Sequence, residues 1–77
     1  PSDEALFQEL RAKRREIADA EHVAAFIVLH DKTLRELAAR RPATLNELTC
    51  IPGMGAAKIA KYGQAFVDVI TAFVEPP

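Results

Sequence analysis

The chain has 77 residues and a mass of 8.5 kDa, which is the size of one small domain. Hydrophobic residues make up 49% of it and charged residues 27%, which excludes a disordered segment. The net charge of −1 excludes a strong general attraction to nucleic acid or anionic lipid, and the single cysteine excludes an internal disulfide framework.

We expect the chain to be a module of a larger protein, because it begins at Pro1 rather than at methionine. It carries no recognisable signal peptide, and no apolar run approaches the ~20 residues that cross a bilayer. We expect a single domain over residues 1–77, with its core at about residues 3–74 and a linker-like tail at residues 75–77.

The predicted elements are all helices, because apolar residues recur three or four positions apart and no strand-like alternation occurs. The first helix is predicted from a cap at Ser2 to about Ala20, with Asp3 and Glu4 in the first turn, where the helix dipole favours acidic residues. Arg14 falls within the apolar stripe of this helix. Its stem should therefore be packed, and its head group should bind a carbonyl or a carboxylate.

Residues 23–29 are apolar but too few for a full amphipathic helix, and they predict a single buried turn. Phe26 in this segment has two interpretations. It could stack on an unpaired base, a contact worth ~1–3 kcal/mol in single-strand binders. Its apolar neighbours favour a core residue instead. A third helix capped by Asp31 should end near Arg40, because Pro42 cannot continue it.

Thr44 and Glu47 have the spacing of a capping box, which predicts a short helix to about Thr49. A tight turn is expected at residues 51–55, and the last helix at about residues 56–73. The fold class is therefore all-α, a single compact bundle of about five helices in which the long first and last helices pack together. The apolar stripe of the last helix consists of Ile59, Tyr62, Phe66, Val69, Ile70 and Phe73.

The turn before the last helix is the most informative feature of the sequence. Gly53 and Gly55 flank Met54 and allow a sharp bend, and the first amides of the following helix have no internal partner, so they can bind an anion. Lys58 and Lys61 follow in the first two turns, where the helix dipole disfavours cations. These features indicate a phosphate-binding site. A structural turn with solvated lysines is the alternative interpretation.

Two further pairs of basic residues are candidates for contacts with phosphate. Arg11 and Arg15 share one face of the first helix and could follow a phosphate backbone, but nearby acidic residues favour a solvated face with ion pairs. Arg40 and Arg41 complement the end of the third helix and could extend a basic strip toward Lys58.

The sequence predicts neither a catalytic site nor a metal site. Ser2 is the only serine, and Cys50, His22 and His30 are the only soft metal ligands. We interpret Cys50 as a small core residue and the two histidines as turn and helix-start residues. We therefore expect no enzyme activity, cofactor, metal or small-molecule substrate in this chain.

Taken in order, these motifs resemble the HRDC domain, the helicase-and-RNase-D C-terminal module. The resemblance covers about residues 6–73, and its most specific part is the glycine turn, which is also similar to a helix-hairpin-helix element. The residues that carry the resemblance are Leu10, Arg11, Arg14, Ile17, Ala18, Val28, Leu29, His30, Asp31, Lys32, Thr33, Leu34, Leu37, Ala38, Pro42, Leu48, Ile51, Pro52, Gly53, Met54, Gly55, Lys58, Lys61, Tyr62, Gly63 and Phe66.

The resemblance implies a five-helix accessory module of a bacterial RecQ-type ATP-dependent DNA helicase, an enzyme of DNA repair and recombination. ATP and Mg²⁺ would serve the parent helicase and not this domain. The implied partners are single-stranded or branched DNA, bound weakly, and the helicase core of the same chain, with no membrane. The implied state is a monomer in the bacterial cytoplasm, associated with the nucleoid.

Some members of this family carry a DNA-contacting tyrosine in the short second segment, and Phe26 matches that position without the hydroxyl. Two alternatives stay open: a module that binds only proteins, which the near-neutral charge favours, and a nucleic-acid-positioning module of an RNase D-type exonuclease. The candidate nucleic-acid-binding residues are Gly53, Met54, Gly55, Lys58, Lys61, Arg40, Arg41 and Phe26.

Overall fold

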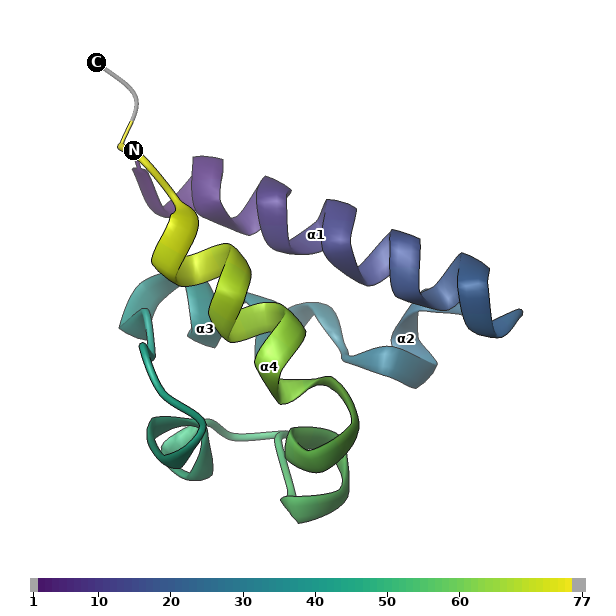
Figure 1. The fold of residues 1–77 in the computed structure, drawn as a ribbon. Helices are drawn as coiled ribbons and strands as arrows, with labels where there is room; N and C mark the ends of the chain where they lie inside the picture. Colours follow the sequence, from purple (N-terminus) through teal and green to yellow (C-terminus); the bar gives the residue numbers. More distant parts are fainter. Residues whose placement is uncertain (1, 76–77) are drawn as a thin grey trace.

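The computed structural model describes residues 2–75, which form helices and no strand within that range. The elements are α1 (Ser2–Glu21), α2 (Ala25–Val28), α3 (Asp31–Arg40), the 3₁₀ helix η1 (Asn46–Cys50) and α4 (Ala56–Ala72), drawn in Figure 1. The all-α prediction is confirmed, although one of the five helical elements is a 3₁₀ helix. The predicted side-chain cap at Ser2 and the last two residues of the predicted tail lie outside what the structure describes.

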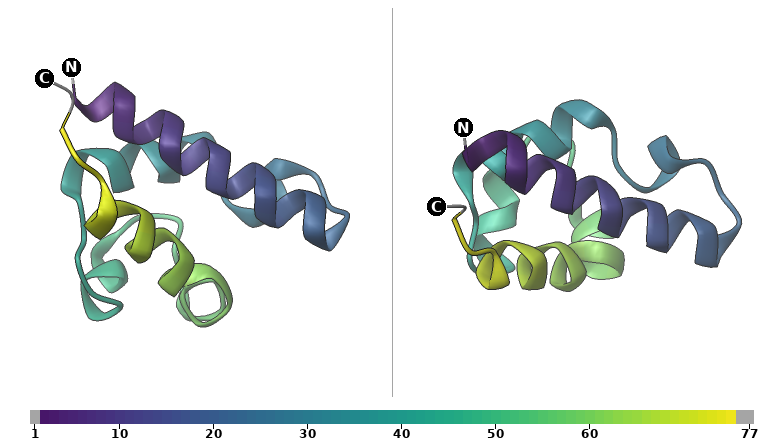
Figure 2. Two further views of the ribbon diagram at one scale, coloured as in Figure 1. Left: turned by 45° about the horizontal axis from the view of Figure 1, so that its top comes forward. Right: turned by 90° about the horizontal axis from the view of Figure 1, so that it is seen from above.

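α1 is the longest element, and the other three α-helices all contact it (Figures 1 and 2). The contacts of α1 with α4 confirm that the long first and last helices pack together. Burial of a leucine or phenylalanine side chain stabilises a fold by about 1.5–3 kcal/mol, so the central residues dominate the stability. The largest fully buried side chains are Phe66, Leu6, Leu10, Leu29, Leu34, Leu37, Leu48 and Val28.

Arg14 joins α1 to the loop between α2 and α3. Its Nη1 donates to the buried carbonyl of Leu29 at 2.9 Å, and its Nη2 lies 2.8 Å from Oδ1 of Asp31. The predicted packing of its stem and bonding of its head group are both confirmed. The predicted cap at Asp31 is wrong, because His30 is the N-cap of α3 and the Asp31 carboxylate, one residue later, binds Arg14 instead.

The segment that leads to α4 departs from the prediction at Cys50. Thr44 Oγ1 accepts a hydrogen bond from the Glu47 amide at 3.2 Å, as the capping box requires, whereas Glu47 Oε2 accepts from the Ala43 amide at 2.6 Å, one residue earlier than in that motif. Cys50 is exposed and not a core residue. Side chains three apart share a face of a 3₁₀ helix, so Leu48 and the following Ile51 are buried while Cys50 points outward.

Candidate nucleic-acid interface

A continuous surface forms where α2, the start of α3 and the turn into α4 meet. Lys58 Nζ donates to the carbonyl of Ile27, which joins α4 to α2, and Thr33 Oγ1 donates to the carbonyl of Pro52 at 3.3 Å, which joins α3 to the turn. A hollow of about 460 Å³ lies between the start of α3 and the turn. We define the α2–α4 surface by Phe26, Ile27, His30, Lys32, Gly53, Gly55 and Lys58.

Phe26 is the exposed aromatic residue of this surface. Its side chain is 58% exposed, and its ring stacks on the His30 ring with centroids 6.1 Å apart and 27° between the planes. The interpretation of Phe26 as a core residue is therefore wrong. A helix of four residues buries only one side, and in α2 that side belongs to Val28, which is fully buried together with the next residue, Leu29.

The turn before α4 leaves backbone amides open to solvent. The cap residue Gly55 offers no side-chain bond, and the first hydrogen bond of the helix runs from the Ile59 amide to the Gly55 carbonyl at 3.0 Å. The amides of residues 56–58 consequently have no acceptor within the helix. Met54 is only 4% exposed, and its amide donates to Ile51 at 3.2 Å, so its side chain anchors the turn in the core and does not reach a ligand.

The two predicted lysines have different surroundings. Lys61 Nζ lies 3.3 Å from Oε1 of Glu21, and the Tyr62 hydroxyl donates to the same oxygen at 2.8 Å. The contacts with Tyr62 and Glu21 raise the pKa of Lys61, and the Tyr62 hydrogen bond lowers the pKa of Glu21. Within residues 2–75 no ion pair joins Lys58 to a carboxylate. Lys58 therefore carries its charge beside the turn, on the Ile27 carbonyl and 5.7 Å from the centroid of the Tyr62 ring, whereas Lys61 fastens α4 to the end of α1.

Arg40 and Arg41 lie at the end of α3, whereas Lys32 of this surface lies at its start. Arg40 binds the Glu36 carboxylate at 2.9 Å and the Cys50 carbonyl at 3.1 Å. Arg41 pairs with Glu75, and its guanidinium lies 5.4 Å from the centroid of the Phe73 ring. Phe73 follows the last turn of α4 and Lys58 is in the first, so Arg41 does not extend a basic strip toward Lys58.

Three members of the surface, Ile27, His30 and Lys32, escaped the sequence prediction. Lys32 had a usable signal, because it is a cation in the first turn of α3, the same conflict with the helix dipole that identified Lys58. His30 was expected only to start the helix, and its stacking on Phe26 depends on the extended backbone between α2 and α3.

The fold and this surface define a small all-helical domain whose last helix begins at a glycine turn beside an exposed aromatic ring. The family model of the HRDC domain matches residues 3–70, and the chain belongs to this family.

Two relatives are ATP-dependent DNA helicases RecQ, from Pasteurella multocida and Bacillus subtilis. Each is 43% identical over 68 residues, which are 88% of this chain. The matches span only 11% and 12% of those two proteins. Among solved structures, HRDC domain 3 of D. radiodurans RecQ matches with a TM-score of 0.88 and 39% identity, covering 92% of this chain and 93% of that one.

No helix in residues 2–75 is both long and apolar enough to cross a membrane. In the same range, histidine, cysteine and acidic side chains do not gather in groups of three or more that could hold a metal ion.

Proposed function

We propose that this chain is an accessory, non-catalytic module of a RecQ-type ATP-dependent DNA helicase and that its α2–α4 surface makes weak contact with single-stranded or branched DNA. The family and the RecQ relatives support the parent, whose motor would use ATP and Mg²⁺ outside this domain. The observation that carries the contact is the exposed Phe26 ring on the helix whose carbonyl binds Lys58.

The chemistry of the surface fits an unpaired strand. A base stacked on Phe26 contributes about 1–3 kcal/mol, as aromatic residues do in single-strand binders. The neighbouring phosphates would meet Lys58, Lys32 and the open amides at the start of α4. With two lysines in contact, log K should fall with log salt with a slope of about −1.4, because single strands contribute about −0.7 per neutralised phosphate.

A second candidate function is docking of the same surface on the helicase core of the parent. Phe26 and Ile27 are adjacent apolar side chains, 58% and 47% exposed, and the net charge of −1 does not favour long-range attraction to DNA. Docking predicts little DNA binding by the isolated domain, and a changed choice of DNA structure when the domain is deleted from the parent.

Fluorescence anisotropy with labelled single-stranded and forked DNA, across a salt series, separates the two functions. Phe26→Ala should weaken binding about 5- to 150-fold through the lost stacking, while Phe26→Tyr should retain it. Lys58→Ala should weaken binding and reduce the salt slope by about 0.7. Val74→Ala, at an apolar residue that is 81% exposed, is the matched control and should change nothing. Binding that survives both Phe26→Ala and Lys58→Ala would refute the contact.

A further inference from the structure

A second hollow, of about 430 Å³, lies between α1 and the start of α2. Three of its lining residues are arginines, and none of those described is acidic. Small alanine side chains leave the guanidinium groups room to approach a ligand. The lining consists of Gln8, Arg11, Ala12, Arg14, Arg15 and Ala25, and we call it the arginine hollow.

The three arginines differ in how far their charges are balanced. Arg14 is committed to the Leu29 carbonyl and to Asp31. Arg15 Nε lies 3.8 Å from Asp19, and because both side chains are more than 70% exposed this pair contributes little. Within residues 2–75, Arg11 contacts the neutral amide oxygen of Gln8 at 3.3 Å, and its guanidinium lies 6.0 Å from the centroid of the Phe7 ring. Arg11 and Arg15 are therefore available to an anion.

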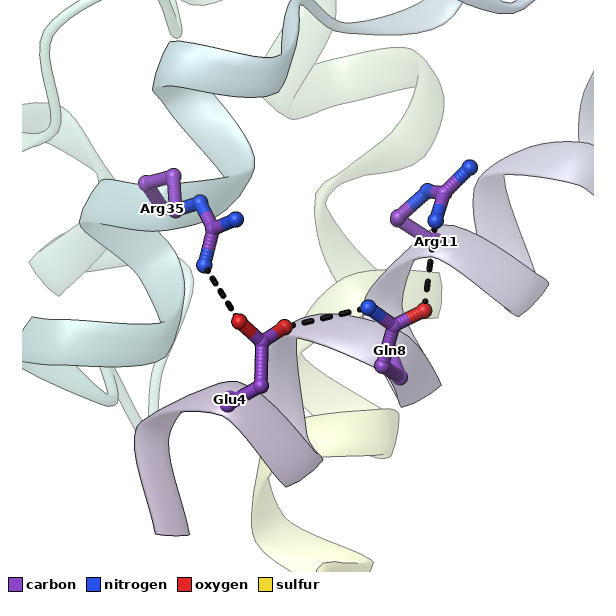
Figure 3. Close-up of polar contacts among 4 residues, drawn as sticks. All are labelled: Glu4, Gln8, Arg11 and Arg35. Atoms are coloured by element: carbon purple, nitrogen blue, oxygen red, sulfur yellow. Dashed lines mark hydrogen bonds and ion pairs between the residues drawn. The ribbon is translucent and has the colours of Figure 1, made fainter. Parts of the chain in front are cut away.

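A chain of hydrogen bonds holds Arg11 at the hollow without neutralising it (Figure 3). Arg35 Nη1 lies 3.2 Å from Oε1 of Glu4, and Gln8 Nε2 donates to Oε2 of the same carboxylate at 3.0 Å. The Arg35 guanidinium is further fixed 3.7 Å above the ring centroid of Phe7. Glu4 thus forms its ion pair with Arg35, and its hydrogen bond with the Gln8 amide nitrogen leaves the Gln8 oxygen facing Arg11.

The arginines of α1 and α3 act on Asp31 at the start of α3. The pKa of Asp31 is lowered, first by its hydrogen bond and ion pair with Arg14 and then by the charges of Arg11 and Arg35. This shift agrees with the geometry of the hollow, where the cations outnumber the carboxylates.

The position of α2 connects the arginine hollow with the α2–α4 surface. Ala25 lines the hollow, Phe26 is the next residue, and the carbonyl of Ile27 binds Lys58. A strand that crosses α2 would therefore pass the arginines, the aromatic ring and the lysine. Each nucleotide carries one phosphate, so a base on Phe26 has a phosphate on either side.

The geometry points to a second phosphate subsite in the arginine hollow, with Arg11 and Arg15 as its binding cations, on a nucleic-acid path that crosses α2. This inference rests on the proposed function of the α2–α4 surface. Arginine suits the role because its planar guanidinium binds phosphate through two parallel hydrogen bonds.

The test is an anisotropy salt series on single-stranded DNA with the double variant Arg11→Gln/Arg15→Gln. Loss of two phosphate contacts should weaken binding about 3- to 10-fold at low salt and change the salt slope from about −2.8, for two lysines and two arginines, to about −1.4. Lys13→Gln is the matched control, because Lys13 is a cation of the same helix that lines the groove between α1 and α4. It should leave the slope unchanged, and circular dichroism should show that all variants are folded.

The outcomes separate this inference from the proposed function. If Phe26→Ala weakens binding while the double variant behaves like Lys13→Gln, the α2–α4 surface stands and the arginine subsite is refuted. If the double variant weakens binding while Phe26→Ala does not, the arginines bind DNA without Phe26, and the path across α2 is refuted. If no variant has an effect, both proposals fail. If Phe26→Ala and the double variant both weaken binding, and of these two only the double variant reduces the salt slope, the subsite is supported.

Discussion

Arg14 shows, at the scale of one residue, how a small core accommodates a charge. Its side chain is 9% exposed, and both of its terminal nitrogens have acceptors in the segment after α2. The angular position of Arg14 within the apolar stripe of α1 made its burial predictable. Its hydrogen bonding was then predictable too, because a buried guanidinium requires acceptors. The identity of the acceptors was not predictable, since they lie 15 or more positions away in the chain.

Arg14→Met should lower the free energy of unfolding by about 1–3 kcal/mol, because methionine keeps the apolar stem but leaves the buried carbonyl of Leu29 without a donor. Urea denaturation measures this change. Arg15→Met, at a side chain 82% exposed, should stay within about 0.5 kcal/mol of the wild type. Equal stability of the two variants would contradict the role of the buried hydrogen bond.

The carboxylate of Asp31 should make the stability depend on pH in the acid range. Its pKa is lowered below the ordinary value of 3.8, chiefly by the Arg14 hydrogen bond. The ionised carboxylate therefore stabilises the fold fully above the unfolded-state pKa, and this contribution is lost as the pH falls through the lower folded-state pKa.

Comparison with Asp31→Asn isolates this contribution, because asparagine does not titrate. The difference in unfolding free energy between the wild type and this variant should be constant near neutral pH and shrink in acid. Urea denaturation at a series of pH values measures it. A difference that stays constant down to the acid limit of folding would show that the ion pair does not contribute.

Phe26 and the lysines mark the limit of prediction at this scale. A four-residue helix has too few positions for its periodicity to reveal which side is buried, so the exposure of Phe26 depends on how α2 packs on α1. Lys58 and Lys61 have similar local sequence, and only the approach of Glu21 from the far end of α1 separates their roles.

At the scale of elements, the two glycines of the turn have different functions. Gly53 has a φ of +88°, and a Cβ at this position would lie 2.2 Å from Oγ1 of Thr33. Gly55 has a φ of −78°, and no atom lies within 4 Å of the place of its Cβ. Only Gly53 is therefore required by the fold, because left-handed backbone and close contact both exclude a side chain there.

Gly53→Ala should destabilise the domain by about 2 kcal/mol, because the left-handed conformation is strained and Thr33 must move. Gly55→Ala should stay within about 1 kcal/mol of the wild type, because the lower entropy of the unfolded chain offsets the poor preference of alanine for the N-cap of α4. Thermal or urea unfolding compares the two. If Gly55→Ala proves the more damaging, the assignment of the bend to Gly53 is wrong.

The bounds of the longer helices were predictable because their ends carry local signals. The dipole-matched acids start α1, the glycine turn starts α4, and Pro42 ends α3, and all three helices agree with expectation to within one or two residues. The 3₁₀ character of η1 was not predictable. A capping-box sequence does not distinguish the hydrogen bonds between residues three apart of a 3₁₀ helix from those between residues four apart of an α-helix.

On the scale of the whole molecule, the described ends of the chain lie together and away from the α2–α4 surface. Arg41 lies within ion-pair distance of both Asp3 and Glu75, which brings the start of α1 to the end of α4 (Figure 2). The α2–α4 surface is at the other end of both helices. Family and fold class could be recognised from the sequence, whereas the joining of α2 to α4 through Lys58 required the three-dimensional packing.

The most direct test of the α2–α4 surface is a ¹H–¹⁵N NMR titration of the domain with a short single-stranded oligonucleotide. If DNA binds there, the amide resonances of residues 25–28 and 53–58 should shift progressively, while those of residues 40–41 should stay in place. Shifts confined to residues 40–41, or none with a large excess of DNA, would contradict the account.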